Sequence, residues 1–136
     1  MHDKAFFDTN IVLYLYSKDE IKKQSNSLRL VNECAQAIIS TQVVNELINV
    51  LSKKTGLEWD EITNVLEEIR ESFTIHIVNL TAIQSACKLA KRYQYSYFDS
   101  LILASALASN ATVLFSEDMQ NGQIIENRLK IINPYL

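Results

Sequence analysis

The chain has 136 residues, which is enough for one domain with a single sizeable hydrophobic core. Apolar residues make up 48%, with two glycines and one proline, so the composition excludes a disordered or collagen-like chain and argues against an all-β fold with many tight turns. The formal net charge of −3 does not supply the basic surface typical of nucleic-acid-binding domains, although bound divalent cations can offset a local cluster of acids.

Short apolar runs alternate with amphipathic segments along the whole chain. We expect strands at residues 5–7, 37–39, 73–78, 111–115 and 130–132. We expect helices at residues 10–17, 28–36, 41–54, 58–72, 81–93 and 99–109, with a polar loop over residues 18–27. The helix at 99–109 is apolar or small on almost every side, which predicts that it lies in the middle of the domain.

Strands that alternate with helices in this way indicate right-handed βαβ units. The predicted fold class is therefore α/β, with three layers (α/β/α) and a central, mostly parallel sheet of four to five strands. No repeat, linker or low-complexity tract interrupts the pattern, so residues 1–136 are expected to form a single domain.

The cysteines and the apolar runs bear on where the protein works. Cys34 and Cys87 stand far apart without a CxxC motif, which argues against a disulfide framework and against a structural zinc site. The N-terminus lacks the charged and apolar regions of a signal peptide. The longest apolar runs, such as residues 101–104, fall far short of the ~20 residues that a membrane span needs. We therefore expect a soluble, cytoplasmic protein without a membrane partner.

Acidic residues follow several of the predicted strands. Asp8 ends the first strand, and Glu46 lies about two turns into the helix that follows the second. Asp99 opens the apolar helix, and Glu117 and Asp118 come directly after the fourth strand. In a parallel sheet these positions lie along one edge, where functional side chains gather, so we expect the carboxylates to converge.

Converging carboxylates repel one another, and their pKa values rise unless a cation compensates the charge. With oxygen ligands alone, and no cysteine or histidine nearby, such a site suits the hard cations Mg²⁺ or Mn²⁺ rather than Zn²⁺. Mg²⁺ keeps several waters and binds one or two carboxylates together with substrate phosphate oxygens. The chemistry most natural to such a site is hydrolysis of a phosphodiester by a metal-activated water.

Each acid also has a purely structural interpretation. Asp8 is a good cap for the first short helix, and Asp99 fits a capping-box pattern. Glu117 and Asp118 suit a turn, and Glu46 suits a solvated helix face. Short patterns of this kind recur by chance, so each acid taken alone favours the structural interpretation. Their joint placement after three strands and on an apolar helix favours a shared function.

Four segments of the chain resemble the PIN-domain family, in particular the VapC-like toxins of bacterial toxin–antitoxin pairs. They are residues 7–11 (FDTNI), 40–47 (STQVVNEL), 97–106 (YFDSLILASA) and 114–119 (LFSEDM). They occur in the family's order and spacing, and the resemblance covers essentially the whole chain. It implies a Mg²⁺- or Mn²⁺-dependent endoribonuclease that hydrolyses RNA.

The resemblance also implies which residues act and which partners bind. The family's acidic quartet, which holds the metal and positions the water, corresponds to Asp8, Glu46, Asp99 and Asp118. Asn10 and Ser116 correspond to supporting polar positions that orient the first acid and make hydrogen bonds on the phosphate side. Glu117 is either an additional ligand or a bystander. VapC-like proteins commonly form homodimers and are blocked by a cognate antitoxin, so both partners are implied here.

Two other functions compete with this interpretation. A phosphoacceptor receiver domain is also a small α/β fold with acids at strand ends, but it requires an aspartate after the third strand, where this chain has Asn79. A PIN-like protein that has lost catalysis and acts as a scaffold or RNA-binding protein is the second. Degenerate members of such families typically lose one or more acids, whereas this chain retains every matching one, so hydrolysis is favoured.

Overall fold

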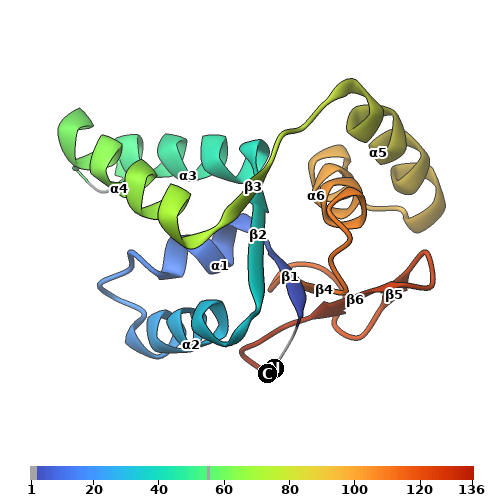
Figure 1. The fold of residues 1–136 in the computed structure, drawn as a ribbon, viewed down its shortest axis with the longest axis horizontal. Coiled ribbons are helices and arrows are strands. Elements are labelled where there is room, and N and C mark those ends of the chain that lie inside the picture. The colour runs from blue at the N-terminus through green and yellow to red at the C-terminus, as the bar shows by residue number, and fades with distance from the viewer. Residues whose placement is uncertain (1–2, 55) are drawn as a thin grey trace.

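A six-stranded sheet forms the centre of the computed structural model, which describes residues 3–54 and 56–136. The strands run in the order β3-β2-β1-β4-β6-β5 (Figure 1). Their bounds are β1 (Lys4–Phe7), β2 (Gln36–Ser40), β3 (Thr74–His76), β4 (Val113–Phe115), β5 (Ile124–Ile125) and β6 (Leu129–Ile132). Every neighbouring pair is parallel except β5 and β6, which are antiparallel.

The helices that connect these strands lie on both faces of the sheet. Their bounds are α1 (Thr9–Tyr14), α2 (Ile21–Glu33), α3 (Thr41–Lys54), α4 (Trp59–Ser72), α5 (Leu80–Tyr93) and α6 (Tyr97–Ala108). Helices α1 to α4 cover one face, and α5 and α6 cover the other (Figure 1). A mostly parallel sheet between two layers of helices confirms the predicted α/β fold class.

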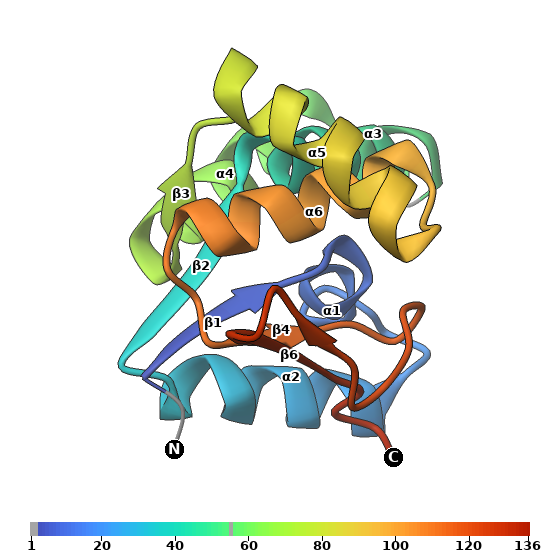
Figure 2. The ribbon, with the colours of Figure 1, turned by 90° about the vertical axis from the view of Figure 1, so that its right-hand side faces the viewer.

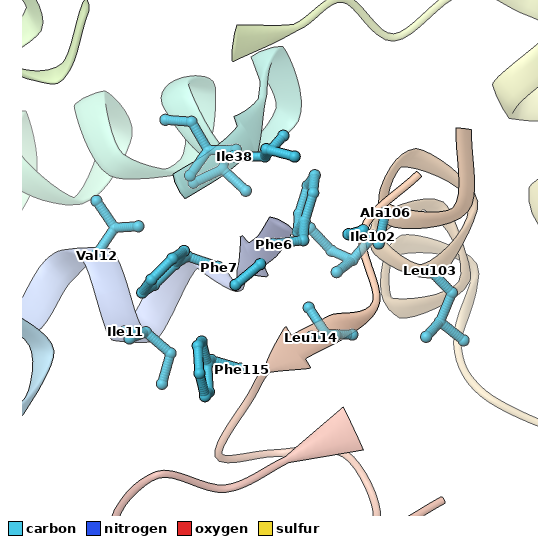
Figure 3. Packing of buried hydrophobic residues seen from close by; sticks show 14 of the residues in the cluster. Phe6, Phe7, Ile11, Val12, Ile38, Ile102, Leu103, Ala106, Leu114 and Phe115 are labelled. Carbon is cyan, nitrogen blue, oxygen red and sulfur yellow. The ribbon is translucent and has the colours of Figure 1, made fainter. Parts of the chain in front are cut away.

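The central strand β1 supplies side chains to both halves of the core. Phe6 lies toward Ile102 of α6, whereas Phe7 lies toward α1 (Figure 3), as expected because successive side chains of a strand point to opposite faces. The ring of Phe7 packs against those of Phe73 and Phe115, with centroids 5.6 and 5.2 Å apart. Both faces of β1 are therefore buried from Ala5 to Phe7, and the first polar residue after this run is Asp8, where the strand ends.

Helix α6 lies between α5 and the sheet (Figure 2), which confirms the predicted central position of the apolar helix. All residues in the range 100–107 are buried, since α5 covers the side of α6 that faces away from the sheet. Because it is buried on every side, α6 lacks the polar face that a surface helix turns toward solvent. Despite its apolarity, α6 has only 12 residues, and no helix in the described part of the chain has the length and apolarity to cross a membrane.

The predicted loop over residues 18–27 is wrong, because α2 begins at Ile21. Most side chains of its first turns are polar and face solvent, and only Ser27 and Leu30 are buried. Leu28, the first residue of the helix predicted at residues 28–36, is 54% exposed. The helix is therefore held by a narrower apolar stripe than the sequence pattern suggested.

Other differences concern the ends of elements. The sheet has one strand more than the upper end of the predicted range, because β5 has only two residues and no detectable periodicity. Strand β3 is shorter than predicted, and Asn79 rather than Thr81 caps α5 by accepting a 2.9 Å hydrogen bond from the amide of Ala82.

Candidate functional site

Asp8 and Ser116 come directly after two neighbouring parallel strands. Phe7 of β1 pairs with Phe115 of β4, and the amide of Asp8 donates a 3.0 Å hydrogen bond to the carbonyl of Phe115. The Ser116 hydroxyl then donates a 2.9 Å hydrogen bond to Oδ2 of Asp8. Since both residues are buried, this contact fixes the Asp8 carboxylate at the edge of the sheet.

The Asp8 carboxylate also caps α1. Its Oδ1 accepts a 2.8 Å hydrogen bond from the amide of Thr9. Burial raises the pKa of Asp8 to about 6 from an ordinary value of 3.8, against the lowering effect of the hydrogen bonds from Ser116 and Thr9. The charges of Asp99 and Asp118 contribute to the same rise in the pKa of Asp8. Asp8 is thus both a helix cap and one of three mutually repelling carboxylates.

Asp118 is held by both α1 and the end of β4. The side-chain amide of Asn10 donates a 2.8 Å hydrogen bond to Oδ2 of Asp118. The Ser116 hydroxyl oxygen accepts bonds of 3.3 Å from the amides of Asp118 and Met119. Asn10 therefore restrains Asp118 rather than the first acid, Asp8, whereas Ser116 links Asp8 to the loop that carries Asp118.

Asp99 lies half-buried in the first turn of α6, where the helix N-terminus favours a negative charge. Its backbone amide donates a 3.2 Å hydrogen bond to the hydroxyl of Ser96, which caps the helix as the sequence pattern predicted. Burial raises the pKa of Asp99, a hydrogen bond with Ser96 opposes the rise, and the charge of Asp118 adds to it. Asp99 is therefore electrostatically coupled to the acids at the ends of β1 and β4.

Glu46 is exposed on α3 and is connected to α6 through one buried side chain. Nε2 of Gln42 donates a 2.9 Å hydrogen bond to Oε1 of Glu46 and a 3.1 Å bond to the carbonyl of Phe98. The residue after Phe98 is Asp99, so this bridge couples the position of Glu46 to the start of the helix that carries Asp99. Gln42 was missed in the sequence, although a glutamine four residues before a glutamate on a helix is a signal for such a contact.

Glu117 is bound by residues of α1 and α2. Lys23 donates a 2.6 Å hydrogen bond to Oε2 of Glu117, and the Tyr14 hydroxyl donates to Oε1. Burial acts to raise the pKa of Glu117, but the hydrogen bonds from Lys23 and Tyr14 and the charge of Lys23 outweigh it and lower the pKa. The Glu117 carboxylate is thus neutralised by its own ion pair, which favours the bystander interpretation.

The residues fit a hard cation in their chemistry, although they do not form a closed metal site. Among the residues that the structure describes, no three acidic, histidine or cysteine side chains lie close enough together to make a preorganised ligand group. Mg²⁺ does not require one, because it binds through one or two carboxylates and keeps several waters. Burial is the main cause of the raised pKa values of Asp8 and Asp99, and the charges of neighbouring carboxylates add to both. A cation fits this arrangement, since its charge would favour the ionised carboxylates.

Comparison with known proteins identifies the fold family. A family model described as PIN domain matches residues 5–121, which is most of the chain. The chain belongs to the PIN domain family. The match includes all four motif segments found in the sequence and confirms that resemblance. No curated protein sequence matches the chain.

Several solved structures are similar to this PIN domain. A toxin–antitoxin complex from Klebsiella pneumoniae has 20% identity and a TM-score of 0.73, over 96% of this chain and 98% of that chain. VapBC2 from Rickettsia felis, bound to a DNA fragment from its promoter, has 20% identity and a TM-score of 0.69, over 96% of this chain and 99% of that chain. VapC20 from Mycobacterium tuberculosis, described as a sarcin–ricin loop cleaving toxin, has 18% identity and a TM-score of 0.68, over 84% of this chain and 91% of that chain. Identities this low establish a shared fold.

The PIN domain brings three of the predicted acids close together and holds the other two by separate contacts. Asp8, Asp99 and Asp118 influence one another's charge, and Asn10 and Ser116 hold two of them. Glu46 approaches through the Gln42 bridge, and Glu117 is held by Lys23 and Tyr14. The PIN domain therefore presents an acidic edge built from β1, β4 and α6, with α3 alongside.

Proposed function

We propose that this PIN domain is an endoribonuclease that hydrolyses RNA phosphodiester bonds with Mg²⁺ or Mn²⁺. The observation that carries the proposal is the Ser116 hydroxyl, which connects Asp8 to the loop of Asp118 at one edge of the sheet. Burial raises the pKa of Asp8, and the charges of Asp99 and Asp118 add to the rise, a cost that a neutral cap would avoid. The description of VapC20 as cleaving the sarcin–ricin loop supports RNA as the substrate class.

In this proposal Asp8, Asp99 and Asp118 would hold the metal, either directly or through its bound waters, and Glu46 is the fourth acid of the site. When bound, the metal would activate a water and stabilise the charge on the attacked phosphoryl group. The protein's own contribution is positioning. Ser116 restrains Oδ2 of Asp8 before any substrate arrives, which reduces the reorganisation needed on binding.

The remaining contacts divide between the two sides of the site. Asn10 restrains Oδ2 of Asp118 on the β4 side. On the α6 side, Gln42 holds Glu46 against the backbone of Phe98. These restraints reach the acids from α1 and α3, so the acidic edge depends on helices as well as on strand ends.

Cleavage of single-stranded RNA by the purified chain tests this function. We expect cleavage with MgCl₂ or MnCl₂, none in EDTA, and none with Asp8→Asn or Asp99→Asn. Asp60→Asn is the matched control, because Asp60 is an exposed aspartate in the first turn of α4, away from the acidic edge. Wild-type cleavage by both site variants would refute the assignment. Binding of RNA without cleavage under every metal condition would instead support the catalytically inactive alternative.

We propose further that the protein is the toxin of a toxin–antitoxin pair acting in the cytoplasm. The similar structures from Klebsiella pneumoniae and Rickettsia felis were solved as toxin–antitoxin or VapBC assemblies, which supports an antitoxin partner. Expression of the wild-type chain in a bacterial host is expected to arrest growth, and Asp8→Asn is expected to abolish the arrest. Normal growth at high levels of folded wild-type protein would contradict the toxin assignment.

A homodimer is the second proposed assembly. Ile77 and Leu80, at the end of β3 and the start of α5, are 72% and 68% exposed, and Ile83 continues the same stretch. A contiguous patch of exposed apolar side chains is typical of an interaction surface, and this stretch supports one here. The mass of the purified chain by light scattering tests this: Leu80→Lys should convert a dimer to a monomer, and a monomeric wild type would contradict it.

A further inference from the structure

A pocket of about 530 Å³ lies beside the acidic edge, between α3 and the start of α6. Its lining comprises Thr41, Gln42, Asn45, Glu46, Val78, Phe98 and Leu101. One of these residues, Glu46, belongs to the proposed catalytic set, and another, Phe98, immediately precedes Asp99. The pocket therefore borders the acidic edge through Glu46 and has the volume to take a nucleoside.

The two walls of the pocket are fixed to each other by Gln42. Gln42 is buried, with 8% exposure, and its Nε2 donates to Glu46 of α3 and to the Phe98 carbonyl of α6. Both partners are acceptors, which determines that the amide nitrogen rather than the oxygen faces them. The spacing of the walls is thus set by a buried hydrogen-bonded bridge, so the pocket is formed before anything binds.

The walls present an aromatic ring and an uncommitted amide. Phe98 is 64% exposed, and the ring of Tyr97 packs edge-on against it with centroids 5.2 Å apart. Asn45 is exposed on α3, and its amide makes no hydrogen bond to the described part of the chain. An exposed aromatic face and an amide with both donors and an acceptor are the groups that stack on single-stranded bases and read their edges.

The chemistry of the lining decides between an RNA base and a protein segment. An apolar helix or strand in the pocket would cover Asn45 and the Glu46 carboxylate without pairing them, which is unfavourable. A nucleobase offers an apolar face for Phe98 and polar edges for Asn45, and its phosphate would lie toward the acids and their metal. The pocket thus suits the base of a nucleotide, and the acidic edge with its metal suits the phosphate.

We propose that this pocket binds the base of a nucleotide next to the scissile phosphate, with Phe98 stacking on the base and Asn45 selecting its identity. The proposal rests on the ribonuclease function and adds to it a determinant of sequence preference. Phe98 contributes affinity for any base, because every base has a face to stack on. Asn45 contributes discrimination, because the hydrogen-bonding edges differ between bases.

Cleavage of a randomised single-stranded RNA by the full chain tests the two roles separately. Asn45→Ala is expected to flatten the base preference at one position beside the cleaved bond. Phe98→Leu is expected to lower kcat/KM about tenfold for all sequences through KM, whereas Phe98→Tyr, which keeps the ring, should retain it. Asn49→Ala is the control, since Asn49 is exposed one turn farther along α3 and does not line the pocket. An unchanged base preference in Asn45→Ala together with an unchanged KM in Phe98→Leu would overturn the inference.

A binding experiment separates failure of this inference from failure of the ribonuclease function. Adenosine, guanosine, cytidine and uridine are titrated in EDTA and followed by amide chemical shifts. Nucleosides are used rather than nucleotides because, in EDTA, no metal offsets the charge of Glu46, which would repel a phosphate. Shifts at Asn45 and Phe98 support the pocket even if no RNA is cleaved, and their absence for all four nucleosides contradicts it. A change in the oligomeric mass of Phe98→Leu, with its KM for RNA unchanged and the base preference of Asn45→Ala unchanged, would identify the pocket as a protein interface and also overturn the proposal.

Discussion

The hydroxyl of Ser116 donates a 2.9 Å hydrogen bond to the carboxylate of Asp8, a residue 108 positions earlier in the chain. The parallel pairing of β1 with β4 makes the contact possible, because it places the first residues after both strands side by side. The same hydroxyl oxygen accepts the amides of Asp118 and Met119. One buried side chain therefore joins two acids that arise at opposite ends of the sequence.

Ser116→Ala is expected to weaken metal binding and cleavage by about 10- to 100-fold, the usual effect of removing a group that orients a metal ligand. The pKa of Asp8 should rise further, because the lost hydrogen bond lowers it. Metal titration by calorimetry and the rate of RNA cleavage measure the effect. Ser52→Ala, which removes only a bond to the carbonyl of Asn49 on α3, serves as the control, and equal behaviour of the two variants would contradict the role of Ser116.

Asp8→Asn should stabilise the metal-free protein at neutral pH, although it removes the proposed activity. The pKa of Asp8 is about 6 in the folded state and 3.8 when exposed, so the folded state binds this proton more tightly. The free energy of unfolding therefore falls as the pH rises between these values, by up to about 3 kcal/mol. Asparagine avoids this penalty, so we expect a gain on the order of 1–3 kcal/mol above pH 6 and little gain at pH 4.

Urea unfolding in EDTA across this pH range measures the difference between Asp8→Asn and the wild type. Mg²⁺ should then stabilise the wild type, by about 2.7 kcal/mol at a concentration one hundred times its Kd, and should leave the variant almost unchanged. A wild-type pH slope that persists in Asp8→Asn would show that another group causes it.

The motifs and the apolar helix were predictable because their signals are local. Asp8, Asp99 and Asp118 each stand at the end of a strand or at the start of a helix, and the parallel α/β pattern alone indicates that such positions share an edge. The burial of α6 followed from its composition, since almost every side chain in it is apolar or small. These features required no knowledge of which distant residues touch.

The partners of Asn10 and Glu117 were not predictable, because they depend on how α1 and α2 are placed. Asn10 and Tyr14 lie one turn apart on α1 and hold Asp118 and Glu117, which are consecutive in the loop after β4. Lys23 was assigned to a loop in the sequence, so its 2.6 Å contact with Glu117, across 94 residues, had no basis there. Only the tertiary structure distinguishes Asp118, which belongs to the site, from Glu117, which forms an ion pair with Lys23.

Glu117 and Asp118 are therefore expected to respond oppositely to neutralisation. Asp118→Asn should abolish metal-dependent cleavage, because it removes a proposed ligand. Glu117→Gln should keep cleavage within a few-fold of wild type and lower the melting temperature, because it removes the ion pair with Lys23. Lys23→Met should lower the melting temperature similarly, and the double variant should add little, since both changes break one contact. Loss of cleavage in Glu117→Gln, with cleavage by Asp118→Asn unchanged, would reverse the two assignments.

Gln42→Leu separates the positioning of Glu46 from the stability of the fold. Leucine removes the two hydrogen bonds donated to Glu46 and to the Phe98 carbonyl, but it also removes the buried Oε1 of Gln42, which has no partner among the described residues. These effects oppose each other, so the free energy of unfolding should change by about 1 kcal/mol or less. Cleavage should nevertheless fall by about tenfold or more, because Glu46 is no longer tied to the start of α6. Chemical denaturation and single-turnover cleavage together test this, and a loss of activity that merely follows a loss of folded protein would assign Gln42 to the fold alone.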